Sequence, residues 1–313
     1  MKLKASSNNN AVIHRDVKGC LLLNKPSGIT SAYAVSVVKR CFQAKKAGHT
    51  GTLDPLATGM LVICFGKATK IAQFLLDSDK EYEVTCKLGI RTSTADACGE
   101  IIQKEDASMV KKEQLIAALN NFTGEIEQTP PMFSSIKHHG TRLYKLARQG
   151  RNVKRNSRLI NIKKLECHEF NADIFKLFVR CSKGTYIRQL VDDIGLSLDC
   201  GAYVTKLHRL SVNNFKKDSM VKLETIKKLA KEAPEKLDDT LISADQALSQ
   251  LPNCIVSEGE ARAINTGQLV RMNNFQETGH VKIYDPDMHF LGVGKLARDG
   301  TLAPKQVFYQ NNV

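Results

Sequence analysis

The sequence predicts an α+β fold with a mixed or antiparallel central sheet and flanking helices, followed by a small β-domain. Between residues 18 and 250, short apolar runs with the patterning of strands alternate with helical segments. From residue 251 to residue 313 the pattern changes to short β-like runs and several glycines, without a long helix. A chain of 313 residues is long enough for one large domain and a satellite, at about 150 residues per domain.

The composition is that of a soluble globular protein, with 42% hydrophobic and 25% charged residues. The net charge of +14 indicates a polyanionic partner or an anionic membrane surface. Nucleic acid is the better candidate, because no basic amphipathic helix with an aromatic face stands out. No apolar run approaches the roughly 20 residues that a membrane-spanning helix needs.

The cysteines and the N-terminal segment both favour a cytoplasmic protein. The nine cysteines are scattered and lack a Cys-x-x-Cys pair, which fits reduced thiols better than disulfides or zinc ligands. We therefore expect no metal site. Residues 1–17 are polar and lack the apolar centre of a secretory signal, so we expect a disordered lead.

The first predicted elements are a strand, a turn and a helix. Gly19 to Asn24 is a short apolar run that predicts the strand, and Lys25 to Gly28 has the composition of a turn. The helix begins with Thr30 or Ser31 as its N-cap and continues to about Cys41.

The next stretch combines a tight loop with a buried strand. Glycines and a proline bracket a single carboxylate, Asp54, and the apolar run from Met60 to Phe65 predicts the strand. A polar loop seated against buried structure can hold a reactive side chain rigidly while leaving it accessible. The alternative interpretation is a glycine-rich turn in which Asp54 caps a backbone amide.

Two further elements follow this strand. Residues 68–76 predict a helix, and residues 80–88 alternate as a half-buried strand with Tyr82 on its apolar face. In the loop after this strand, we expect Asp96 to be a structural or phosphate-side residue rather than a second catalytic acid.

The segment from residue 130 to residue 158 carries an unusual charge run. From Lys137 to Lys164 there are ten Lys or Arg residues and no Asp or Glu. A charge run is usually a solvated face, but one this one-sided would repel itself unless something anionic lay across it. We therefore expect a mobile nucleic-acid clamp that becomes ordered on binding.

The following elements complete the large domain. Two strands are predicted over residues 159–171 and 173–181, then a helix from about Thr185 with Arg188 in its first turn. A strand, a glycine and a helix in this order frequently bind an anion or carboxylate at the helix N-terminus. Residues 202–212 predict another strand, and its basic residues are expected at an RNA-facing edge.

The residues around Asp54 resemble the catalytic motif of the bacterial tRNA pseudouridine synthase B family, which converts the uridine at position 55 of the tRNA T-loop into pseudouridine. The stretch from Gly48 to Gly59 matches the order Gly-His-x-Gly-x-Leu-Asp-Pro-x-Ala-x-Gly. Other matches, beginning with the Asn-Lys-Pro-x-Gly-x-Thr-Ser stretch at Asn24, occur in the same order over most of residues 19–215.

The resemblance implies the pseudouridine synthase fold and a division of the chain. Residues 18–250 would form the catalytic domain, with residues 130–158 as a thumb-like insertion, and residues 251–313 would form a PUA-like RNA-binding barrel. The motifs of this last segment are weak, so a small accessory β-domain without a direct role in the chemistry is nearly as well supported.

The resemblance also implies roles for individual residues. Asp54 would be the nucleophile or charge stabiliser, and Arg188 would pair with it and favour its ionised form. Tyr82 would stack on the target uracil, and His49 would enter the T-loop in place of the flipped base. The other residues expected in the pocket or against RNA are Lys25, Tyr186, Lys137, Arg142, Arg148, Arg151, Lys206 and Arg209.

The leading hypothesis is therefore a tRNA pseudouridine synthase that needs no cofactor, guide RNA or obligate protein partner and acts as a monomer. Isomerising uridine is redox-neutral, so neither a metal nor an organic cofactor is required. The basic insertion favours this hypothesis over the related guide-dependent enzymes. The alternatives are a non-catalytic tRNA-binding or folding factor and a glycosidase-like hydrolase, which would usually need two carboxylates.

Overall fold

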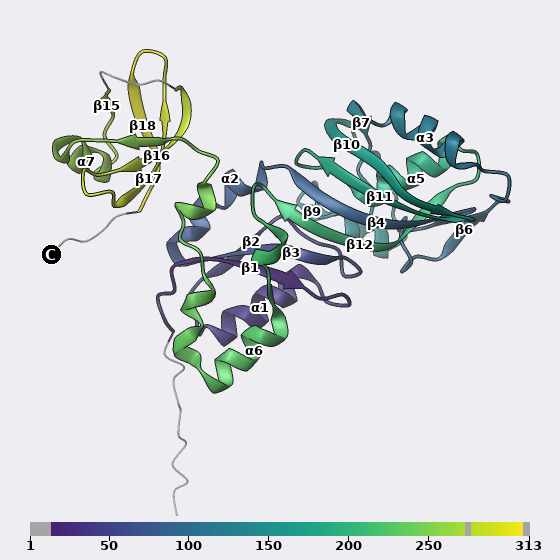
Figure 1. The fold of residues 1–313 in the computed structure, drawn as a ribbon, viewed down its shortest axis with the longest axis horizontal. Helices are drawn as coiled ribbons and strands as arrows, with labels where there is room; N and C mark the ends of the chain where they lie inside the picture. The colour runs from purple at the N-terminus through teal and green to yellow at the C-terminus, as the bar shows by residue number, and fades with distance from the viewer. Residues whose placement is uncertain (1–13, 273–276, 309–313) are drawn as a thin grey trace, which may run out of the picture.

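The computed structural model describes residues 14–272 and 277–308, and its largest element is a nine-stranded sheet (Figure 1). The strands of this sheet are β1 (Gly19–Lys25), β2 (Ala47–Thr50), β3 (Thr58–Phe65), β4 (Lys80–Leu88), β7 (Gly124–Gln128), β10 (Arg158–Asn171), β11 (Ile174–Cys181), β12 (Ala202–Val212) and β13 (Val221–Lys222). They run in the order β13-β1-β3-β12-β4-β11-β10-β7, and β2 pairs with β3 beside this path. The β1–β13 and β3–β12 pairs are parallel and the others antiparallel, which confirms the predicted mixed sheet.

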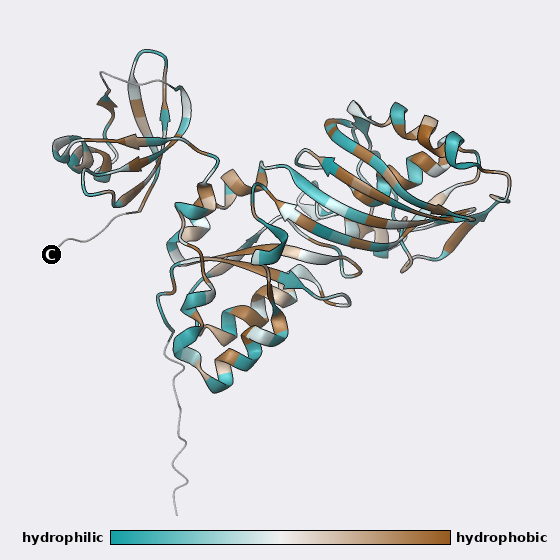
Figure 2. Ribbon diagram, in the orientation of Figure 1, coloured by the Kyte–Doolittle hydropathy of each residue, from teal (hydrophilic) through white to brown (hydrophobic). Residues whose placement is uncertain are grey.

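Helices cover the sheet on both faces. One face packs against four helices in a single apolar core, and these helices are α1 (Ser31–Cys41), α3 (Lys112–Asn121), α5 (Ile187–Ser197) and α6 (Leu223–Glu232). The opposite face of β1 and β3 packs against a 3₁₀ turn, η1 (Gly66–Ile71), and the short helix α2 (Ala72–Leu76). Strand β3 is therefore apolar from Met60 to Phe65 (Figure 2), because both of its faces are buried there.

The N-cap of α1 is the predicted one. The Thr30 hydroxyl accepts a hydrogen bond from the Tyr33 amide at 3.1 Å. The helix predicted over residues 68–76 is in fact a 3₁₀ turn followed by a short α-helix.

The C-terminal part forms a separate five-stranded sheet, which lies at one end of the molecule (Figure 1). Its elements are β14 (Asn253–Ile255), α7 (Glu258–Asn265), β15 (Val270–Arg271), β16 (Gly279–Tyr284), β17 (Phe290–Leu296) and β18 (Thr301–Val307). Residues 273–276 and 309–313 of this part lie outside the described residues. This half-barrel sheet confirms a PUA-like C-terminal domain.

The two sheets are joined by direct contacts. Lys70 Nζ donates to the Val307 carbonyl at 2.9 Å, and the rings of Phe74 and His280 meet edge to face at 5.1 Å. Val293 of the C-terminal sheet belongs to the apolar cluster on the outer face of β1 and β3. A polar cavity of about 610 Å³ opens beside these contacts.

Smaller elements complete the chain. The 3₁₀ helices of the connector are η2 (Lys217–Ser219), η3 (Pro234–Lys236), η4 (Asp238–Thr240) and η5 (Gln246–Leu248). Two short hairpins are formed by β5 (Ile90–Thr92) with β6 (Ile101–Lys104) and by β8 (Lys137–His138) with β9 (Thr141–Arg142), and the latter continues into α4 (Leu143–Arg148).

The end of the predicted disordered lead is ordered, which corrects that expectation for residues 14–17. Arg15 forms a bridge with Ala44 and an ion pair with Asp238 at 2.5 Å, and the Val17 side chain is buried in the main core. Residues 1–13 of the expected lead lie outside the described residues.

Candidate active site

The loop that carries Asp54 connects β2 to β3 and is held by the start of α1 and the turn that precedes it. The Ser31 hydroxyl accepts from the Leu53 amide at 2.8 Å, and the Gly28 amide donates to the Pro55 carbonyl at 2.8 Å. These bonds fix the backbone on both sides of Asp54. The two sequence motifs that begin at Asn24 and Gly48 therefore meet in space, with the first supporting the second.

Arg188 binds the Asp54 carboxylate through two hydrogen bonds. Its Nε lies 2.8 Å from Asp54 Oδ2, and its Nη2 lies 3.2 Å from Oδ1. The arginine side chain is 4% exposed, whereas the aspartate side chain is 34% exposed. The carboxylate is thus held rigidly from one side and left open to solvent on the other, as a group that reacts with a bound substrate must be.

The same guanidinium also binds two other loops. Its Nη1 donates to the Thr94 carbonyl at 2.6 Å, and its Nη2 donates to the Phe133 carbonyl at 2.9 Å. Phe133 lies at the base of the basic insertion. Arg188 therefore connects the Asp54 loop, the β5–β6 loop and the insertion.

Asp96 is a second carboxylate beside Arg188, and the sequence did not predict this proximity. Its Oδ2 lies 3.6 Å from Arg188 Nε, and its Oδ1 accepts from Thr94 Oγ1 at 2.6 Å and from the Cys98 amide at 3.0 Å. The expected structural role fits these loop hydrogen bonds. The proximity to Arg188 arises from a fold contact between residues 92 positions apart, and no local pattern in the sequence signals it.

Tyr82 and Lys25 lie on the floor of the site. The Tyr82 residue is 7% exposed, and burial raises the pKa of its phenol, with the charge of Asp54 among the smaller causes. Lys25 is fully buried and donates to the carbonyls of Pro26 and Ile29 at 2.8 Å and of Pro55 at 3.4 Å. Burial lowers the pKa of Lys25 to about 8, partly offset by Asp54. Lys25 thus supports the Asp54 loop from inside.

Tyr186 precedes α5 and lies beside the insertion. Its amide donates to the Gln128 side chain at 2.8 Å, and the Arg158 guanidinium lies 4.9 Å from the centre of its ring. The Gln128 amide group in turn donates to the Tyr186 carbonyl at 3.1 Å. The start of α5 that was expected to bind an anion is therefore already occupied in part by a side chain of the protein.

His49 lies on strand β2 rather than in a loop. It pairs with Ile63 of β3, because the residues before the Asp54 loop add a short strand to the edge of β3. Burial lowers the pKa of His49, and the charge of Arg209 lowers it further. Its Nδ1 is buried without a hydrogen-bond partner among the described residues.

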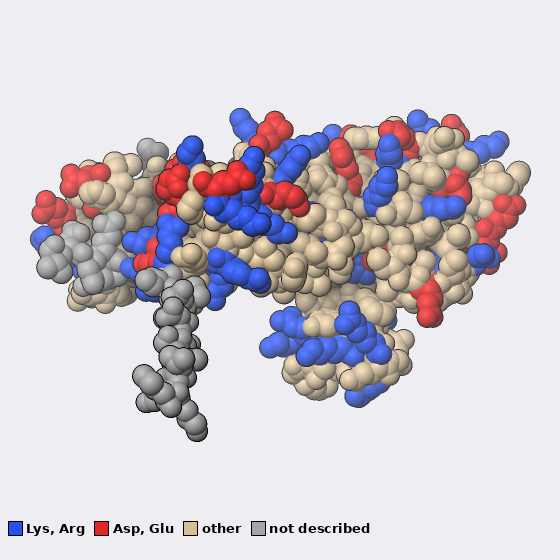
Figure 3. All heavy atoms as spheres, turned by 90° about the horizontal axis from the view of Figure 1, so that it is seen from below, with Lys and Arg blue, Asp and Glu red and all other residues tan. Residues whose placement is uncertain are grey.

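The basic insertion projects from the body as a lobe on which Lys and Arg gather and no acidic residue is visible (Figure 3). Leu143 and Leu146 are buried beneath it, so the hairpin and α4 have a small core of their own. The predicted RNA contacts that are exposed on this lobe are Lys137, Arg142, Arg148 and Arg151.

The expected RNA-facing edge at β12 is wrong. This strand lies in the interior of the sheet, between β3 and β4. Arg209 is 1% exposed and hydrogen-bonded to main-chain carbonyls, so RNA cannot reach its side chain. Lys206 is exposed, but alternation along the strand places it on the face opposite Arg209 and Tyr82.

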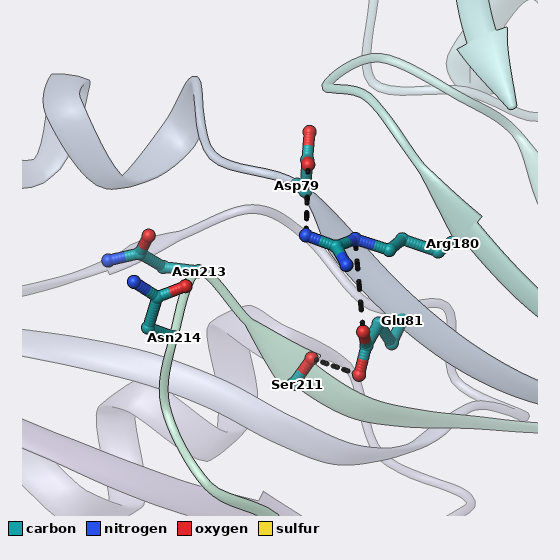
Figure 4. A pocket seen from close by; sticks show the side chains of 6 residues that line it. All are labelled: Asp79, Glu81, Arg180, Ser211, Asn213 and Asn214. Carbon is teal, nitrogen blue, oxygen red and sulfur yellow. Dashed lines mark hydrogen bonds and ion pairs between the residues drawn. The ribbon is translucent and has the colours of Figure 1, made fainter. Parts of the chain in front are cut away.

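A small cavity of about 60 Å³ lies on that opposite face (Figure 4). Arg180 reaches toward both Asp79 and Glu81 there, and the Ser211 hydroxyl donates to Glu81 at 3.0 Å. Two carboxylates and one guanidinium line this cavity, and none of the three joins the Asp54 network. The part of the chain that the structure describes contains no cluster of three or more His, Cys, Asp or Glu side chains suited to a metal ion. In the same residues, no helix is both long and apolar enough to cross a membrane.

Three family models match consecutive segments of the chain. Residues 39–187 match the TruB family pseudouridylate synthase N-terminal domain, residues 188–249 the tRNA pseudouridylate synthase B C-terminal domain, and residues 252–308 the pseudouridine synthase II TruB C-terminal domain. The tRNA pseudouridine synthase B of Actinobacillus succinogenes is 45% identical over 95% of this chain and 96% of its own. The tRNA pseudouridine synthase B of Actinobacillus pleuropneumoniae is 48% identical over 94% of this chain and 96% of its own.

Solved structures show the same fold. In the crystal structure of a Cbf5-Nop10-Gar1 complex, one chain superposes with a TM-score of 0.73 and 25% identity, covering 94% of this chain and 86% of that one. In the archaeal box H/ACA sRNP Nop10-Cbf5 complex, the TM-score is 0.72 with 24% identity, over 95% and 88% of the two chains.

Proposed function

The chain belongs to the TruB family of pseudouridylate synthases and is a tRNA pseudouridine synthase, and from this premise we propose that it isomerises the uridine at position 55 of the tRNA T-loop. The observation that carries the proposal is the Asp54 carboxylate, which Arg188 holds by two hydrogen bonds while one side stays open. The reaction breaks the C–N glycosidic bond, turns the uracil and forms a C–C bond to the same sugar, so atoms and electrons balance within the nucleotide.

Asp54 is the proposed reactive group. An ionised carboxylate can attack or stabilise an electron-poor centre of the nucleoside while the glycosidic bond breaks. Arg188 fixes its orientation, and loss of that orientation would cost rate because reacting atoms must approach within about 3–3.5 Å. The C5 proton must leave after the new bond forms. Tyr82, on the floor of the site, is proposed to stack on the uracil.

His49 is proposed to offset the cost of extracting the base. Flipping a stacked base costs a few kcal/mol, and an aromatic ring that stacks in its place returns roughly 1–3 kcal/mol. The lowered pKa of His49 keeps its ring neutral near pH 7, so that insertion among bases does not require a charge to be desolvated.

The basic insertion is proposed to bind the phosphates of the T-arm, and the protein to act as a monomer without a guide RNA. Six exposed Lys or Arg residues between positions 137 and 154, with no acidic residue between Lys137 and Lys164, support this. The chain would then select its substrate by the shape and charge of the tRNA itself.

Tritium release from tRNA labelled at uridine C5 tests the proposal, with wild type and Asp54→Asn compared and tRNA binding measured in the same samples. We expect release by the wild type alone and binding by both. A matched tRNA with cytidine at position 55 should give no release. Binding by both proteins with release by neither would leave a tRNA-binding factor, and release from the cytidine-55 tRNA would place the reaction at another position.

A further inference from the structure

Arg209 is buried at the centre of the large sheet, between the two structures that form the active site. On β12 it is paired with Gly59 of β3 on one side and with Tyr82 of β4 on the other. Its Nε donates to the Met60 carbonyl at 2.7 Å, and its Nη2 donates to the Gly51 carbonyl at 3.0 Å. Gly51 lies three residues before Asp54, so one guanidinium contacts the catalytic loop and the strand that follows it.

The backbone is folded tightly around this arginine. Gly59 has a φ of +97°, and a Cβ atom there would lie 2.2 Å from the Arg209 carbonyl oxygen. Gly51 has a φ of +88°, and its Cβ would lie 3.6 Å from Arg209 Nη1. Gly59 therefore allows β3 to approach Arg209 closely, whereas glycine is favoured at position 51 by its positive φ alone.

The buried charge of Arg209 has no acidic partner. The ion pairs of the described residues in this region join Arg188 to Asp54 and Asp96, and none includes Arg209. A buried cation without an acidic partner costs stability, which favours a role in the site over a purely stabilising one. Burial raises the pKa of the Tyr82 phenol, and the charge of Arg209 is the next influence and lowers it.

We propose that Arg209 is a positioning residue, which holds the Asp54 loop and the phenol of Tyr82 in one fixed relation. The two groups come from separate parts of the sheet but must meet the same uracil, and β12 lies between them. The planar guanidinium binds the carbonyls of Met60 and Gly51 at once, from the strand position that pairs with Tyr82. A lysine ammonium cannot reproduce that geometry. This inference rests on the proposed function of the site.

The first test compares Arg209→Lys with Arg180→Lys, a matched control on the opposite face of the sheet (Figure 4). Single-turnover pseudouridine formation at saturating enzyme, the tRNA Kd and the thermal midpoint are measured for each. We expect Arg209→Lys to slow the reaction by about tenfold or more while the Kd changes by less than about threefold. The control should match the wild type in all three. Equal losses in rate and affinity would overturn the proposal.

A double-mutant cycle with Tyr82→Phe tests whether Arg209 acts through Tyr82. Arg209→Lys lowers the rate by one factor in the wild type and by another in the Tyr82→Phe protein. We expect the factor in the Tyr82→Phe protein to be at least about threefold smaller. Additive losses would contradict the role. Arg209→Gln keeps a planar donor without the charge, and it replaces Arg209→Lys in the cycle if the latter does not melt cooperatively. A wild type that forms no pseudouridine would refute the proposed function itself rather than the role of Arg209.

Discussion

Arg188 Nε lies 2.8 Å from Asp54 Oδ2, although 134 residues separate the two in the sequence. The same side chain donates to the carbonyl of Phe133, at the base of the basic insertion. The buried side chain of Arg188 thus connects the Asp54 carboxylate to the insertion that is proposed to bind tRNA. This arrangement leads to the first prediction.

Replacing Arg188 with Ala should reduce turnover far more than tRNA affinity. The substitution frees the Asp54 carboxylate and leaves the Thr94 and Phe133 carbonyls without their donor. A misplacement of about 1 Å in a reacting group costs about 100-fold in rate, so we expect a loss of at least this size. Single-turnover rates and filter binding measure the two effects, with Arg180→Ala as the control. Equal losses in rate and affinity would contradict the pairing role.

Removing four exposed positive charges from the insertion should weaken the salt dependence of tRNA binding. The variant carries Gln at Lys137, Arg142, Arg148 and Arg151, all exposed, and leaves the buried Leu143 and Leu146 in place. The slope of log affinity against log salt should fall by roughly 0.7–0.9 for each phosphate that the lobe no longer neutralises.

A matched variant removes four charges from the opposite face of the sheet, with Gln at Lys87, Lys176, Arg180 and Lys206. Its salt slope should equal that of the wild type. If the two variants gave the same slope, the residues that bind phosphate would have to lie elsewhere.

Replacing His49 with Ala should impair the reaction on folded tRNA more than on a single-stranded oligonucleotide of the same sequence. Only the folded T-loop requires the base to be extracted and its place filled. A stacking contribution of ~1–3 kcal/mol corresponds to roughly 5- to 150-fold in rate. Single-turnover assays on both substrates measure the difference, and similar losses on the two would argue against insertion of this ring.

His49 should also make the fold less stable in mild acid. Burial and Arg209 lower its pKa below the ordinary value of 6.5, so below that pH the unfolded chain binds more protons than the folded one. Stability contributed by the neutral ring is present above pH 6.5 and is lost as the pH falls. Thermal midpoints between pH 7.5 and 5.5 should therefore fall more for wild type than for His49→Gln. If the thermal midpoints of the two proteins fell in parallel with pH, protonation of His49 would carry no cost in stability.

Local patterns in the sequence were sufficient for most elements of the fold. The strands expected at residues 159–171 and 173–181 match β10 and β11 within one residue at each end, because alternating burial is a local property. The N-cap of α1 and the buried strand β3 were likewise predicted from the local sequence. The motif resemblance predicted that Asp54, Tyr82 and Arg188 share one site, and the structure brings them together.

Long-range pairing accounts for the features that local patterns could not predict. The pattern of β12 fits an edge strand equally well, and only its pairing with β3 and β4 across more than a hundred residues makes it central. A bulge between Val204 and Lys206 also changes which side chains face the core. The burial of Arg209 and the approach of Asp96 to Arg188 follow from such pairing.

The hydrogen bond from Arg188 to the Phe133 carbonyl also bears on how substrate range could be redesigned. Its acceptor is a main-chain oxygen, so no change of side chain at position 133 removes it. The hairpin and helix beyond this point can therefore be recoded for a different RNA stem while the link to the reaction centre stays intact. A chimera that retains residues 130–134 and exchanges the rest of the lobe should therefore keep the hydrogen bond to Arg188 while it binds a different RNA stem.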